Sequence, residues 1–78
     1  MMSRRVRILY AYYCLMRPPA PGAVPTRGLV EMESFDRRYY VEIVDRMAWG
    51  WVGYDRPLSP SEVDEYELIS VPRDLFSP

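Results

Sequence analysis

Near the start of the chain, the pattern of apolar and polar side chains at alternate positions predicts a first strand over residues 5–16. Aromatic and β-branched side chains, which favour extended backbone, are frequent in this segment. One face of the strand would be apolar throughout, and the other would become apolar only towards its end. We therefore expect the second half of the strand to be covered on both sides. The apolar face would hold Val6, Ile8, Tyr10, Tyr12, Cys14 and Met16, and the other face Arg5, Arg7, Leu9, Ala11, Tyr13 and Leu15.

A proline-rich segment over residues 18–26 separates this strand from a second alternating stretch, residues 28–35. Proline fixes φ and lacks a backbone N–H, so the segment is neither a helix nor a central strand. The pair Pro21-Gly22 is typical of a type II turn. The second stretch, GLVEMESF, predicts a strand that pairs with the first. The proline segment would then be a stiff hairpin connector between the two strands.

Residues 36–48, DRRYYVEIVDRMA, follow the period of a helix. Tyr40, Ile43, Val44 and Met47 would form one apolar stripe. On the opposite face, Arg38 and Glu42 are spaced to form an ion pair, and Ser34 or Asp36 is suited to cap the N-terminus. We expect the longer helix of the domain here.

The remainder of the chain predicts a strand, a short helix and a last short strand. Residues 49–56, WGWVGYDR, alternate as a strand would. In LSPSEV, Ser59, Pro60 and Glu62 occupy the positions of a capping box, which predicts a helix from Pro60 to about Tyr66. Residues 68–71 would form the last strand.

These elements follow the order β-β-α-β-α-(β). They predict a single small α+β domain over residues 1–72, in which the longer helix packs on one face of a small antiparallel sheet. Residues 73–78 would be a loose C-terminal tail. With 78 residues, the chain is near the lower size limit for a domain with its own core.

The composition excludes several kinds of chemistry. The chain has no His, and all ten of its basic residues are Arg. There is accordingly no imidazole base, no Cys/His zinc site and no lysine for a Schiff base. Glu31 and Glu33 could bind a hard cation, but alternating acids on a strand are more often a solvated face, so we expect no metal. Because these chemistries are excluded and no Walker A or GxGxxG motif is present, we also expect no cofactor and no enzyme activity.

The single cysteine and the N-terminal segment predict the compartment. Cys14 has no second cysteine to pair with, which suits a reducing cytoplasm. Arg7 interrupts the apolar run and Arg17 ends it before any small-residue cleavage site, so the N-terminus does not have the pattern of a signal peptide. We expect a cytoplasmic protein that does not enter a membrane.

Charge and aromatic residues indicate two candidate binding surfaces. Residues 1–27 hold five Arg and no acid, whereas residues 28–78 hold five Arg and eleven acids, a net charge of −6. Part of the acidic excess lies in the second helix, which could bind an Arg-rich partner or imitate nucleic-acid phosphates. Large aromatic side chains in the third strand are typical of interfaces. The predicted partner-binding residues are Glu62, Asp64, Glu65, Glu67, Trp49, Trp51 and Tyr54.

Two alternatives to a protein-binding module remain open. Arg5, Arg7, Tyr10 and Tyr12 could bind single-stranded nucleic acid by combining phosphate contacts with base stacking. An overall pI near 5.3 is unusual for such a protein. The chain could also form a structural homodimer along a strand edge.

Three longer stretches resemble short proteins of phages and conjugative elements in gut bacteria. These stretches are YAYYCLMRPPAPGAVP, FDRRYYVEIVDRMAWGWVGYDRPLS and SEVDEYEL, within residues 8–69. Related segments look like modules of large polyvalent proteins. The shared motifs are structural, so the resemblance carries over no catalytic residue. It implies a protein that binds a host or mobile-element protein, such as a defence nuclease complex, and inhibits bacterial defence as anti-CRISPR proteins do.

Overall fold

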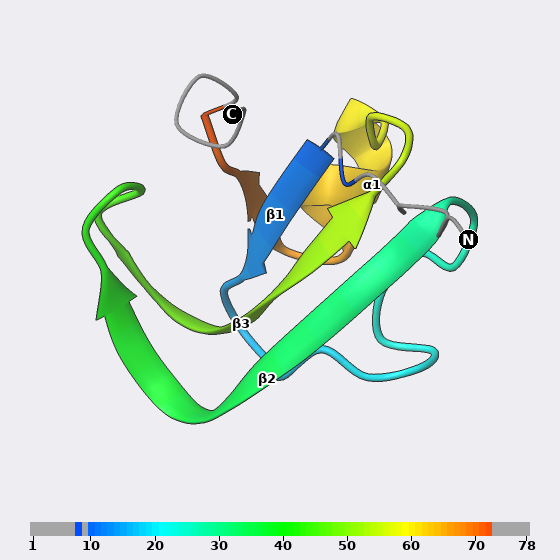
Figure 1. Cartoon of the computed structure of the whole chain (residues 1–78). Helices are drawn as coiled ribbons and strands as arrows, with labels where there is room; N and C mark the ends of the chain where they lie inside the picture. Colours follow the sequence, from blue (N-terminus) through cyan, green and yellow to red (C-terminus); the bar gives the residue numbers. More distant parts are fainter. Residues whose placement is uncertain (1–7, 9, 73–78) are drawn as a thin grey trace, which may run out of the picture.

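The computed structural model describes residues 8 and 10–72, and its centre is a four-stranded antiparallel sheet (Figure 1). The strands lie in the order β2-β3-β1-β4. The described residues contain one helix, which is short. The elements are β1 (Tyr10–Cys14), β2 (Leu29–Val41), β3 (Arg46–Tyr54), α1 (Pro60–Glu65) and β4 (Leu68–Ser70). The predicted α+β domain with a longer helix on the sheet is therefore wrong, because the architecture is mostly sheet.

The predicted helix over residues 36–48 is in fact the end of β2, a turn and the start of β3. The N–H groups of Val44 and Asp45 bond to the carbonyls of Val41 and Glu42, and Asp45 takes a φ of 56°. A helix within a protein gains most of its stability by packing its apolar stripe against the rest of the fold. Here that stripe is exposed, since 57% of Tyr40 is accessible. The β-forming residues instead pair across the turn.

The proline segment joins two strands that are not neighbours. β3 pairs with both β1 and β2 and runs antiparallel to each, so β1 and β2 are parallel. Parallel strands require a crossover connection, which a tight hairpin cannot provide. The predicted hairpin connector is therefore wrong: residues 15–28 form a crossover, and Val24, at 4% exposed, reaches into the core. The predicted type II turn is confirmed, because the Ala23 N–H bonds to the Ala20 carbonyl at 2.9 Å and Gly22 has a φ of 88°.

The core lies between one face of the sheet and the two segments that cover it. Tyr12 and Tyr54 meet edge to face at its centre, with ring centroids 5.9 Å apart. The Tyr54 hydroxyl donates to the Pro25 carbonyl, and the Tyr12 hydroxyl accepts from the Leu58 N–H. These two bonds attach the crossover and the segment before α1 to the sheet. The buried cluster consists of Tyr12, Cys14, Val24, Val52, Tyr54, Leu58 and Leu68.

The predicted capping box at the start of α1 is confirmed. The Ser59 hydroxyl accepts from the Glu62 N–H at 3.2 Å, and a Glu62 carboxylate oxygen accepts from the Ser59 N–H at 2.8 Å. The helix ends at Glu65, with Tyr66 as its C-cap. β1, β3 and β4 each overlap the strand predicted for that part of the chain. The predicted tail, residues 73–78, lies outside the described residues.

β2 is interrupted by a bulge that turns its second half away from the core. The pairing register with β3 shifts between Ser34 and Tyr39, and Asp36 takes a φ of 71°. Beyond this point β2, the turn and the start of β3 extend away from the helix (Figure 1). We call residues 37–48 the hairpin arm.

Candidate functional site: a cleft beside the helix

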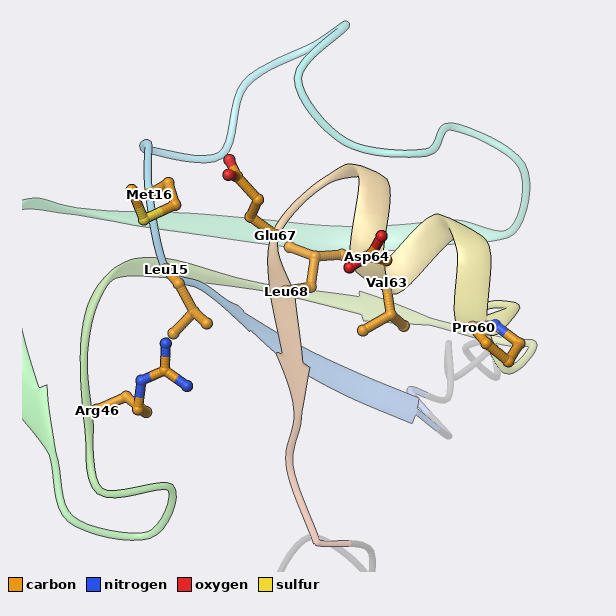
Figure 2. A pocket seen from close by; sticks show the side chains of 8 residues that line it. All are labelled: Leu15, Met16, Arg46, Pro60, Val63, Asp64, Glu67 and Leu68. Atoms are coloured by element: carbon orange, nitrogen blue, oxygen red, sulfur yellow. The ribbon is translucent and has the colours of Figure 1, made fainter.

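A cleft of about 530 Å³ lies between α1, the end of β1 and the start of β3 (Figure 2). Its walls come from segments far apart in the sequence, which the sheet order brings together. β1 lies between β3 and β4, and α1 leads directly into β4. The lining residues are Leu15, Met16, Arg46, Pro60, Val63, Asp64, Glu67 and Leu68.

The cleft combines apolar side chains with charges of both signs. Leu68 is buried and Leu15 and Val63 are half-buried, so these three provide apolar surface. Arg46 enters from the β3 side, and Asp64 lies across the cleft on α1 (Figure 2). Such a site is suited to a protein segment that presents an apolar side chain next to a charged one.

The four acidic candidates of the helix segment line two separate sites. Asp64 and Glu67 line the cleft, whereas Glu62 and Glu65 line a separate hollow beside the end of the crossover. Glu67 forms an exposed ion pair with Arg17, with 2.8 Å between Nη2 and Oε1. The predicted acidic surface is thus divided into two parts.

Glu62 has a structural role that accounts for its charge. Arg56 donates to both of its carboxylate oxygens, at 3.0 and 2.9 Å. The hydrogen bonds from Arg56, followed by the one from the Ser59 N–H, lower the pKa of Glu62 to about 2. Its carboxylate is fully engaged within the chain.

The aromatic candidates in β3 do not form one surface. Tyr54 is 0% exposed and belongs to the core, where burial raises the pKa of its hydroxyl. Trp51 is half-buried on the opposite face of the sheet, and its Nε1 donates to Glu33 at 2.8 Å. Trp49 is also half-buried. None of the three lines the cleft.

The candidates for nucleic-acid binding are separated as well. Tyr12 is 5% exposed, so its ring is not open to stack on a base, whereas Tyr10 is half-buried and packs against the core cluster. Arg5 and Arg7 lie outside the described residues. Of the two described candidates, Tyr12 therefore belongs to the core.

A chain of aromatic rings on other residues was missed by the sequence analysis. Phe35 contacts Tyr13 and Tyr39, with centroids 6.4 and 5.8 Å away. The Arg37 guanidinium lies 5.3 Å from the centroid of Tyr39. Alternation in the first strand places Tyr13 on the opposite face from Tyr12, so this part of the chain of rings could have been found from the sequence. The contact with Tyr39 depends on the bulge in β2, and residues 36–48 were predicted to be a helix.

Cys14 is unsuited to nucleophilic chemistry. It is 2% exposed, and burial raises the pKa of its thiol to about 11. Among residues 8 and 10–72, no group of three or more acidic or Cys side chains is arranged to hold a metal ion. The same residues include no helix long and apolar enough to cross a membrane.

Comparisons with known proteins give the family. Residues 8–73 match the model of the family described as Defence against restriction A C-terminal. Over 67 residues, the chain is 34% identical to Defense against restriction protein A of Escherichia phage P1, a match that covers 83% of this chain and 10% of that protein. The chain thus spans about a tenth of the length of the curated relative that it matches. No solved structure matches it. The chain therefore belongs to the Defence against restriction A C-terminal family.

Proposed function

We propose that the chain is a non-enzymatic protein-binding module that serves phage defence against host restriction. The observation that carries this proposal is the family match over residues 8–73, together with the name of the phage P1 relative. A phage context agrees with the resemblance found in the sequence. The relative's name directs the proposal to restriction, whereas the gut-bacterial, polyvalent-protein and anti-CRISPR contexts stay predictions.

The cleft beside α1 is the surface that supports binding best. It joins an exposed acid, Asp64, and an exposed base, Arg46, to a half-buried apolar wall. A partner segment with an apolar side chain next to an arginine would bury the first against Leu15 and Val63 and pair the second with Asp64. The partner proposed is a protein of the host restriction system, and its occlusion in the bacterial cytoplasm would protect unmodified DNA.

The composition supports binding rather than catalysis. The chain has no His or Lys, and its one thiol is buried with a raised pKa. Within the described residues, the carboxylates of Glu62 and Glu67 already have arginine partners. These groups offer no poised acid or base for hydrolysis of a phosphodiester.

The test is a plating assay in a strain with an active restriction system. Cells that express the chain are infected with unmodified phage, and plating is compared with that of modified phage. We expect the chain to raise the plating of unmodified phage, and we expect Asp64→Arg to abolish this gain because it reverses the acid of the cleft. Glu65→Arg is the matched control, since Glu65 is an exposed neighbour on the same helix that does not line the cleft.

Two outcomes would contradict the proposal. If the folded chain gives no protection, the anti-restriction role is wrong. If Asp64→Arg and Glu65→Arg protect equally well, the cleft is not the binding surface. Purified restriction enzyme mixed with the chain separates the mechanisms, because a binding module should bind the enzyme and leave the DNA itself unchanged.

A further inference from the structure

The face of the sheet that is turned away from the core carries a row of aromatic rings, and we call it the outer face. Strand register places Trp51 directly opposite Tyr13 on one side and Glu33 on the other. These residues alternate with the core residues of their strands, so their side chains lie on the outer face. The rings of Trp51 and Tyr13 are half-buried, and the ring centroid of Phe35 lies 6.4 Å from that of Tyr13. The outer face is therefore aromatic at its centre.

A small apolar hollow of about 120 Å³ lies beside these rings. Its lining residues are Ala11, Tyr13, Trp51 and Val71. The Trp51 ring is fixed at two points. Its Nε1 donates to Oε1 of Glu33 at 2.8 Å, and its Cζ3 lies where only a glycine leaves room, because a Cβ on Gly53 would be 3.1 Å away. The aromatic wall of the hollow is thus held in place before any partner binds.

Carboxylates border the rings, and the described chain gives them no basic partner. Glu31 and Glu33 are exposed, and their pairing with Gly53 and Trp51 places both on the outer face. The ion pairs of residues 8 and 10–72 are Arg17–Glu67 and Arg56–Glu62, so no described arginine pairs with Glu31 or Glu33. The phosphates of a nucleic acid would be repelled by this face, whereas a cationic side chain would be attracted to it.

The same row of rings already carries one arginine at its other end. Phe35 leads on to Tyr39, and the Arg37 guanidinium lies 5.3 Å from the centroid of the Tyr39 ring. In the part of the chain that the structure describes, no guanidinium lies over Trp51. A guanidinium can stack on an aromatic face and donate to a carboxylate through its edge at the same time. Trp51 and Glu33, which are hydrogen-bonded to each other, present these two groups side by side.

We propose that the outer face binds an arginine side chain of a partner protein, whose aliphatic stem fills the hollow and whose guanidinium stacks on Trp51 and pairs with Glu33. One carboxylate oxygen of Glu33 holds the indole, and the other accepts from the arginine. Glu31 adds a second negative charge on the same face. The inference rests neither on the cleft nor on the restriction partner, so each can fail without the other.

Titration of the full chain with the capped peptide Gly-Ser-Arg-Ser-Gly to millimolar concentration tests the proposal. The indole N–H signal of Trp51 is followed by NMR, and Trp51→Phe assigns it, since the chain has two Trp and the other is Trp49. We expect the peptide to shift the Trp51 signal. A copy with citrulline in place of arginine keeps the shape of the side chain without its charge and should bind about tenfold more weakly.

Variants of the chain locate the binding. Glu33→Gln keeps an oxygen that can accept from the Trp51 indole but removes the charge, so it should weaken binding of the arginine peptide about threefold. Glu65→Gln is the matched control, because it removes an exposed acid from α1. Asp64→Asn removes the acid of the cleft. Both of these variants should bind the peptide as the native chain does.

The proposal is overturned if the arginine peptide leaves the Trp51 signal unchanged, if the citrulline peptide binds equally well, or if Asp64→Asn weakens binding as much as Glu33→Gln. Other occupants would overturn it too. A Trp51 signal that shifts when the chain alone is diluted would assign the outer face to a second copy, and one shifted by oligothymidine would assign it to nucleic acid. Peptide binding that requires replacement of the three arginines of residues 1–7 by serine would assign it to this chain's own N-terminal segment.

Discussion

The Tyr54 hydroxyl donates a hydrogen bond of 2.7 Å to the backbone carbonyl of Pro25. Tyr54 ends β3, near the middle of the sheet, and Pro25 lies in the crossover that covers it. Both residues are buried, so the bond satisfies a carbonyl that water cannot reach. It joins two segments whose distance in sequence makes their contact expensive in chain entropy.

Tyr54→Phe should destabilise the fold by about 1–3 kcal/mol, because it leaves the buried Pro25 carbonyl without a donor and keeps the ring. Urea unfolding followed by tryptophan fluorescence measures the change in the free energy of unfolding. Tyr39→Phe is the control: Tyr39 is 47% exposed, so its change should stay within about 0.5 kcal/mol. Equal effects of the two substitutions would show that the Pro25 bond contributes nothing.

Features encoded by a few adjacent residues could be predicted from the sequence. The capping box depends on Ser59 and Glu62 alone, and the type II turn depends on Pro21-Gly22. In both cases the favoured backbone conformation and its hydrogen bonds lie within one turn of chain.

Features decided by distant contacts could not be predicted. In the hairpin arm, the spacing of Tyr40, Ile43 and Met47 fits a helix, but the same residues are acceptable in a strand and a turn. The choice depends on whether another surface covers the stripe, and in the described chain none does. The crossover likewise depends on β3 pairing between β1 and β2, which no local pattern indicates.

Two of the residues that line the cleft were among the predicted partner-binding residues. Asp64 and Glu67 were selected for their charge, and both line the cleft. The apolar wall was missed, because Leu15 and Val63 resemble ordinary core residues in the sequence. Tyr54 was selected as an interface aromatic. It lies two residues from Val52 and therefore on the same face of β3, and both side chains belong to the core.

Ser59→Ala should cost about 1 kcal/mol in the free energy of unfolding, because α1 loses the acceptor for the Glu62 N–H. The helix is too short to be stable without its cap and its packing. Thermal unfolding by circular dichroism measures the effect, with Ser70→Ala at the exposed end of β4 as control. A Ser59 variant as stable as the control would mean that the capping box is not needed.

Stability should fall in acid as Glu62 is protonated. Its folded pKa of about 2 lies below the ordinary value of 4.5, so its contribution is fully present above pH 4.5 and is lost as the pH falls towards 2. The urea midpoint of the native sequence should therefore decrease more steeply over this range than that of Glu62→Gln. Glu65→Gln, which changes an exposed acid, should follow the native profile. Parallel profiles for the native chain and Glu62→Gln would contradict the role of the Arg56 pair.

Cys14 should react with thiol reagents only when the domain opens. Its side chain is 2% exposed and its thiol has a pKa of about 11, so the folded state presents almost no accessible thiolate at pH 8. We expect labelling by a chromogenic disulfide to be slow in buffer and to accelerate by orders of magnitude in urea. Tyr54→Phe should also accelerate labelling in buffer, in proportion to its loss of stability, because the two residues share one core. Complete labelling of the native chain within seconds would show that β1 is not protected as the fold requires.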